Sequence, residues 1–312
     1  MAIIVLDVIQ DKLAGLYDKN ITDGATKNFK NIIVNMAMAS FLLHILLVYI
    51  IYNTPFLPRL THLLPHNYLA AIYTPFSFII IYEIFELVIA IPRSITHFIS
   101  KQFEIISLIF LREVFKDLTH LSDLTLTEAN QQVFFKEIMV DMGTAIGLFF
   151  LLVVFNHVNT FRFRYSNTCE VRSYINVKKS LAFILGVSVI GLSIWSMFDW
   201  AITGYNVISS GGDYYQPLKL VFFKDFFTIL VFVDIFLLIF ALIYTNAYDV
   251  IFRNGAFVIS TILIRLSITS PRPLNIYVAL MAVALGIITS AIFVYYHKVH
   301  QGQNRDLLEA CD

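Results

Sequence analysis

Cysteine and charge are both scarce in this chain of 312 residues. The two cysteines, Cys169 and Cys311, exclude a disulfide framework, and neither has a spacing typical of a metal site. Charged residues make up 14% of the chain, whereas a soluble domain carries about 25%. Lysine plus arginine equals aspartate plus glutamate at 22 each, so the chain lacks the basic excess of a nucleic-acid-binding protein and the acidic excess of a disordered one.

Motifs of enzymes are lacking as well. The chain contains no P-loop, no GxGxxG and no GxSxG. His62 and His66 flank Pro65, and no third ligand stands near them. We therefore expect no catalytic residues, no metal and no cofactor, and we expect that the protein is not an enzyme. Glycine and proline are few within the apolar segments, which favours continuous helices over the broken helices of many transporters.

Hydrophobic residues, by contrast, make up 58% of the chain, which includes 29 Phe and 16 Tyr. The mean hydropathy is +0.74. A transmembrane helix needs about 20 mostly apolar residues, and six segments have them: 31–53, 68–91, 131–157, 178–203, 217–246 and 274–297. Two further segments, 94–112 and 250–268, contain charged residues, and hydropathy alone does not decide whether they cross a membrane.

The placement of lysine and arginine predicts that all eight segments cross. Cytoplasmic loops carry the excess of basic residues. With eight crossings, the basic linker 158–177 and the lysines of the N-terminal segment 1–30 fall on one side, together with the tail 299–312. We therefore predict an all-α polytopic membrane protein with both termini in the cytoplasm. Residues 1–31 do not resemble a signal peptide, and residues 3–18 have the spacing of an amphipathic helix lying on the membrane or on the protein.

Two stretches of the chain share a pattern of polar and apolar residues. Each has an acidic residue followed by Ile-Phe-x-Leu, at Glu83 and at Asp234, and then Ile-Ser-x-Ile-x-x-Arg, which ends at Arg112 and at Arg265. The pattern predicts two four-helix repeats, 31–157 and 178–298. Because each repeat has an even number of spans, the two are expected to be parallel, related by an axis along the membrane normal.

Small residues recur at four-residue spacing in the last helix of each predicted repeat. Such spacing allows helix backbones to approach closely, either between the two repeats or in a homo-oligomer. A contact between these two equivalent helices is the simpler expectation. The residues are Gly143 and Gly147 in the first repeat and Ala282, Gly286 and Ser290 in the second.

The second half resembles the phosphate-starvation-inducible E family of small four-span bacterial membrane proteins. The resemblance lies between Val233 and Val294 and rests on Asp234, on Leu242-Ile followed by Tyr248, and on Thr261-x-x-x-Arg265-Leu. It implies four helices per unit and a bacterial inner-membrane location. It implies no catalytic residues.

Ionisable residues inside membrane spans are costly and are therefore candidate functional residues. Residues equally far from a helical hairpin turn lie at similar depth, so Glu86 is expected to pair with Lys101, and Asp234 with Arg265. Asp141 is expected near the same depth. The full set of candidates is Glu83, Glu86, Lys101, Glu104, Arg112, Asp141, Asp234 and Arg265.

Two interpretations of this charge network remain open. It is either a set of ion pairs that fix the packing of helical hairpins or the lining of a water-filled path for ions or protons. The second interpretation predicts a channel or transporter for an ion or small solute. The alternative is a non-transporting sensor or scaffold subunit in a stress response. The expected partners are the lipid bilayer, the transported ion or solute, and other copies of the chain; we expect no nucleic acid.

Overall fold

The computed structural model describes residues 2–21, 23–53, 71–120, 128–160, 169–209, 221–244 and 248–309. In this part of the chain the regular structure is helical and no strand is present, which confirms the predicted all-α class. The helices are α1 (Ala2–Asn20), α2 (Asp23–Asn53), α3 (Tyr73–Ala90), α4 (Ile95–His120), α5 (Glu128–Val158), α6 (Cys169–Ser209), α7 (Val221–Tyr244), α8 (Tyr248–Thr269) and α9 (Leu274–Glu309).

Six of these helices are long and apolar enough to cross a membrane. Of the two ambiguous segments, 250–268 falls in such a helix, α8, whereas 94–112 falls in the more highly charged α4, which is not among the six. The predicted span 68–91 is described only from Ala71, and its helix, α3, is not among the six either. The candidate spans are Thr26–Ile50, Phe134–Val158, Ile175–Leu192, Phe226–Ile243, Tyr248–Thr269 and Leu274–Val299.

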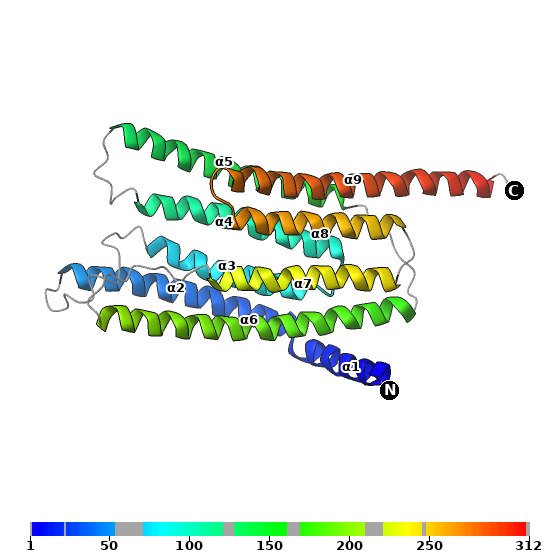
Figure 1. Ribbon diagram of the computed structural model, residues 1–312, viewed down its shortest axis with the longest axis horizontal. Helices are drawn as coiled ribbons and strands as arrows, with labels where there is room; N and C mark the ends of the chain where they lie inside the picture. The colour runs from blue at the N-terminus through cyan, green and yellow to red at the C-terminus, as the bar shows by residue number, and fades with distance from the viewer. Residues whose placement is uncertain are drawn as a thin grey trace.

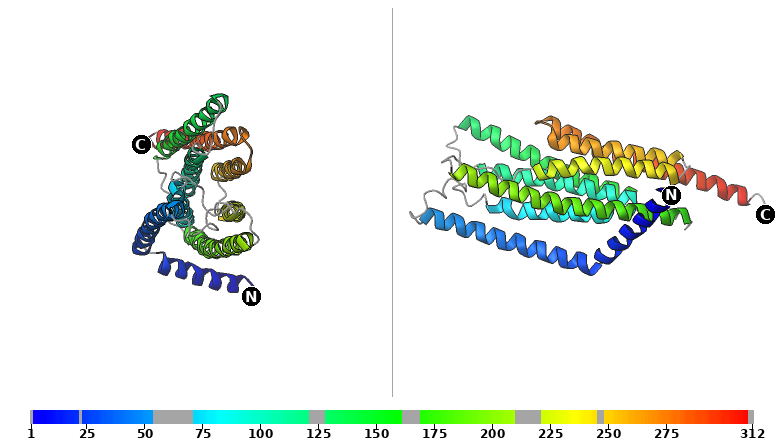
Figure 2. Two further views of the ribbon diagram at one scale, coloured as in Figure 1. Left: turned by 90° about the vertical axis from the view of Figure 1, so that its left-hand side faces the viewer. Right: turned by 60° about the horizontal axis from the view of Figure 1, so that its bottom comes forward.

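Helices α2 to α9 form one elongated bundle. Their long axes are roughly parallel, and both chain ends lie at the same end of the bundle (Figure 1). Helix α1 diverges from α2 at that end and packs against α6 (Figure 2). The predicted helix 3–18 is therefore confirmed as a helix, and it lies on the protein.

The two halves of the chain pack their helices in the same order. Helix α2 contacts α3, α3 contacts α4, and α4 contacts α5; in the second half α6, α7, α8 and α9 follow the same sequence of neighbours. The halves meet where α5 packs on α9, with smaller contacts between α3 and α6 and between α4 and α8. The contact that we expected between the last helices of the two halves, α5 and α9, is present.

Prolines set the two tight turns that the structure describes. Helix α3 ends before Pro92, whose ring cannot continue a helix, and Ser94 Oγ accepts a hydrogen bond from the backbone N–H of His97 at the start of α4 (3.2 Å). Pro271 and Pro273 stand between α8 and α9 in the same way. These short turns make α3–α4 and α8–α9 antiparallel hairpins.

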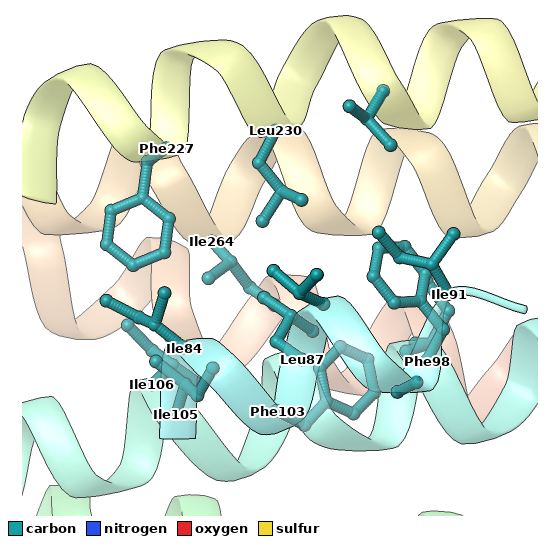
Figure 3. Close-up of a cluster of buried hydrophobic side chains, with 14 of the residues drawn as sticks. Ile84, Leu87, Ile91, Phe98, Phe103, Ile105, Ile106, Phe227, Leu230 and Ile264 are labelled. Carbon is teal, nitrogen blue, oxygen red and sulfur yellow. The ribbon is translucent and has the colours of Figure 1, made fainter. Parts of the chain in front are cut away.

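Most of the interior of the bundle is apolar. Side chains of α3 and α4 interdigitate with those of α7 and α8 (Figure 3), and Leu87, Phe103 and Leu230 are completely buried there. Outer faces also carry large apolar side chains, such as Phe149 and Phe150 of α5, which are more than half exposed. A bundle that is apolar both inside and outside is suited to lipid as its solvent.

The small residues of α5 and α9 behave differently from one another. A side chain added at Gly143 or Gly147 would meet no atom within 4 Å, so the expected close approach at these two glycines is wrong within one chain. A Cβ at Gly286 would lie 2.5 Å from the ring of Phe103, so this ring of α4 packs directly against the backbone of α9. Ala282 and Ser290, on the same stripe of α9, are buried.

Candidate functional site

A buried ion pair lies between α7 and α8. Arg265 Nη2 donates to Asp234 Oδ2 at 2.6 Å, and the two side chains are 8% and 2% exposed. The predicted pairing of these residues is therefore present. Thr261, one helical turn before Arg265, donates its hydroxyl to the same carboxylate oxygen at 2.8 Å. This hydrogen bond is of the kind that a buried ion pair needs to offset the loss of hydration.

Gln102 of α4 completes this centre from the other half of the chain. Its Nε2 donates to Asp234 Oδ1 at 3.4 Å, and its Oε1 accepts from Arg265 Nη2 at 3.2 Å. Gln102 is 4% exposed. Sequence reasoning missed it because it is uncharged and stands next to Lys101, which points to a different cluster. We call this group of four residues the central polar site: Gln102, Asp234, Thr261 and Arg265.

The guanidinium of Arg265 is incompletely paired. Its Nε and Nη1 are buried and have no hydrogen-bond acceptor among the described residues. A cavity of about 10 Å³ lies beside it, bounded by Gln102, Leu87 and Ile264 among others. That volume is at the lower limit for a single water molecule. The central polar site is thus enclosed, and the N–H groups on Nε and Nη1 of Arg265 face little free space.

A second cluster surrounds Lys101 on the α3–α4 hairpin. Lys101 Nζ lies 2.6 Å from Glu86, 2.8 Å from Glu104 and 3.8 Å from Glu83. The expected Glu86–Lys101 pair is present, and the hydroxyl of Tyr82 also donates to Glu86. Three carboxylates therefore share one ammonium group. Glu83 Oε2 is buried and accepts no hydrogen bond from the described residues.

Asp141 belongs to a third group, which surrounds the turn between α8 and α9. Arg272, in the turn between α8 and α9, pairs with Asp141. Its guanidinium also lies 2.9 Å from the carboxylate of Asp117 and 3.9 Å from that of Glu137. The expectation that Asp141 lies at the depth of Asp234 is therefore wrong. Counting from the helix end misplaced it because α5 extends well beyond the α8–α9 turn (Figure 1).

The acidic neighbours of Arg272 also affect its pKa. Burial by itself would lower the pKa of the Arg272 guanidinium. The hydrogen bond that Arg272 donates to Asp117 and the charges of Asp117, Asp141 and Glu113 outweigh burial and raise that pKa above its ordinary value. Arg272 therefore stays charged and ties α4 and α5 of the first half to the α8–α9 turn of the second.

Arg112 stands apart from the central polar site. It is buried on α4, at 3% exposure, and lies ten residues beyond Gln102, or about 15 Å along the helix axis. The eight predicted residues are thus not one network. The structure distributes them over the central polar site, the Lys101 cluster, the Arg272 cluster and the separate position of Arg112.

Histidines take part in helix contacts. His44 Nδ1 and the hydroxyl of Thr74 join α2 to α3 at 2.7 Å, and His297 Nε2 lies 2.9 Å from Asp249, which joins α9 to α8. In the part of the chain that the structure describes, no group of three or more His, Cys, Asp or Glu side chains is placed to hold a metal ion. His62 and His66 lie outside the described residues.

The helices and the buried charges define the class: a multi-pass, all-helical membrane protein with a polar site between its two halves. No family model, no curated protein and no solved structure matches the chain.

Proposed function

We propose that this protein is a channel or transporter for an ion or small solute, built from eight spanning helices, α2 to α9, in two parallel repeats. The shared order of helix neighbours in the two halves supports the repeat. Helices α3 and α4 carry charges, but the charges of Glu83, Glu86, Lys101 and Glu104 lie against one another, which lowers the cost of placing them in a membrane. The lysines and arginines of segment 1–30, linker 158–177 and tail 299–312 support cytoplasmic termini, because cytoplasmic loops carry the excess of basic residues.

The observation that carries the proposal is the position of the central polar site. Asp234, Thr261 and Arg265 belong to one repeat, while Gln102 reaches them from the other. Buried charges inside a membrane protein are expensive and are typical of ion and substrate paths. In transporters built from repeats, the site lies at the repeat interface near mid-membrane.

The described conformation is closed. Leu87, Phe103, Phe227 and Leu230 fill the space between α3–α4 and α7–α8 (Figure 3), and the adjoining cavity of about 10 Å³ is too small for a path. The contacts from Gln102, at 3.2 and 3.4 Å, are the longest in the central polar site. Movement of one repeat against the other would break these contacts first and leave Asp234 paired with Arg265.

The test is reconstitution of the purified chain in proteoliposomes, with fluxes of protons, common cations and common anions measured. We expect flux from the wild-type protein, none from Asp234→Asn, and reduced flux from Glu83→Gln. Asp18→Asn is the matched control, because Asp18 is an exposed carboxylate on α1 outside both clusters, and it should leave the flux unchanged. Absence of flux for every ion tested would contradict the proposal.

The apolar filling of the interface favours a second candidate function, a non-transporting sensor or scaffold subunit. In that case the central polar site only stabilises the packing of the helices. Asp234→Asn then lowers the amount of folded protein, and neither the wild-type protein nor the variant shows flux. The resemblance of the second half to the phosphate-starvation-inducible E family is compatible with either function, and a bacterial inner-membrane location is part of the proposal.

A further inference from the structure

A pocket of about 290 Å³ lies where α1, α2 and α3 meet, next to the α3–α4 turn. It is separate from the central polar site. Tyr17 closes it from α1, with its hydroxyl donating to the backbone oxygen of Ile89 at 3.3 Å. The ion pair of Asp18 with Lys179 of α6, at 2.7 Å, also holds α1 in place.

The polar lining of this pocket is basic. Lys27 and Lys30 of α2 and Arg93 of the α3–α4 turn line it, together with the hydroxyl-bearing Thr26 and Tyr82, and none of its described lining residues is acidic. Lys27 and Lys30 lie one turn apart and so share a face of α2. Lys30 Nζ stands 5.9 Å from the centre of the Tyr82 ring, which holds the ammonium group at the pocket wall.

These groups match a phosphate. An arginine fork and lysine ammonium groups are the side chains that bind phosphate oxygens most strongly. The nearby carboxylates have other partners: Glu83 and Glu86 face Lys101, and Asp18, next to Tyr17, pairs with Lys179. The pocket therefore offers three positive charges to a ligand.

The surroundings of the pocket favour a ligand that is also a lipid. Val34, Met38 and Leu42 follow Lys30 at four-residue intervals on the same side of α2, and they are 50%, 60% and 60% exposed. These side chains belong to the candidate span Thr26–Ile50. Acyl chains can lie along this apolar face of α2 while the head group occupies the basic pocket, as in other head-group sites between membrane helices.

We propose that the pocket between α1, α2 and α3 binds a phosphate group, supplied by the head group of an anionic phospholipid. The site does not depend on transport by the protein. It would fix α1 at the membrane surface through the same ligand that contacts α2 and α3.

The test is native mass spectrometry of the full chain in detergent, titrated with phosphatidylglycerol. Each basic residue near a membrane surface contributes about 1 kcal/mol, so Lys27→Gln/Lys30→Gln should weaken binding about 30-fold. Lys12→Gln/Lys19→Gln is the matched control: it removes the same charge from exposed positions of α1 outside the pocket and should leave binding unchanged. Arg93→Gln should weaken binding in the same direction. Thermal unfolding of each variant verifies that it is folded.

A second arm identifies the source of the phosphate. Inorganic phosphate, titrated by calorimetry, should bind far more weakly than phosphatidylglycerol, and phosphatidylcholine should bind without dependence on Lys27 and Lys30. Tight binding of inorganic phosphate alone would overturn the assignment to a lipid. Equal weakening by the two double variants, or no weakening by either, would overturn the site itself.

Discussion

At the scale of single residues, the most consequential pair is Asp234 with Arg265. Removing one partner of a buried ion pair leaves an uncompensated charge and costs about 3–5 kcal/mol. We therefore expect Asp234→Asn and Arg265→Gln each to reduce the amount of folded protein in membranes. The exchanged double variant Asp234→Arg/Arg265→Asp should recover much of it, because the amide of Gln102 both donates and accepts and can serve either orientation.

The readout of this prediction is the monodisperse fraction of a fluorescent fusion after extraction from membranes. Lys179→Gln, which removes the exposed pair with Asp18, is the control and should have little effect, because exposed pairs contribute about 0–1 kcal/mol. A double variant no better than the worse single variant would show that the pair does not account for the losses.

Two glycines with different surroundings give a second prediction. Gly286→Ala places a methyl group against the ring of Phe103, and overpacking of this kind costs about 1–3 kcal/mol. Gly143→Ala meets nothing and should be neutral or stabilise its helix by up to about 1 kcal/mol. Thermal unfolding in detergent compares the two variants. Phe103→Leu should partly rescue Gly286→Ala; equal effects of the two alanines would contradict the proposed contact.

At the scale of elements, one of the side chains that attach α1 to the bundle titrates. Burial raises the pKa of the Tyr17 phenol from 10.0 to about 12, opposed by the charge of Arg93 and assisted by that of Asp18. The neutral phenol is therefore the form that the folded state favours. Its contribution to docking is complete below pH 10 and is lost as the pH rises through about 12.

We expect a spin label at Lys19→Cys, with Cys169 and Cys311 replaced by serine, to gain mobility between pH 10 and 12. Tyr17→Phe should lose this transition and also the hydrogen bond to Ile89, which contributes about 0.5–1.5 kcal/mol. The phenylalanine variant isolates the contribution of the Tyr17 hydroxyl. Identical curves for the two proteins would exclude Tyr17 as the titrating group.

The elements were largely predictable from the sequence, whereas their relative placement was not. Apolar runs and Pro92 identify the described helices, and distance from a turn identifies the partner of Asp234 within its own hairpin. Asp141 was misplaced because helices of unequal length do not start at a common level. Gln102 was missed because hydropathy and charge mark titratable residues, and a neutral amide from a distant helix carries no signal until the halves are packed together.

At the scale of the whole molecule, the central claim is that α3 and α4 cross the membrane, because only then does Gln102 reach the Asp234–Arg265 pair inside it. If only the six candidate spans crossed, the α3–α4 turn and the α8–α9 turn would lie on the same side of the membrane. With eight crossings they lie on opposite sides. The two readings therefore predict different accessibilities for two short turns.

The most direct measurement is labelling of single cysteines with a membrane-impermeant maleimide in sealed vesicles of known orientation, with Cys169 and Cys311 replaced by serine. We predict that Ser94→Cys reacts only from the side that holds the termini and that Ser270→Cys reacts only from the opposite side. Reaction of both cysteines from the same side would contradict the eight-span architecture and remove the central polar site from the membrane path.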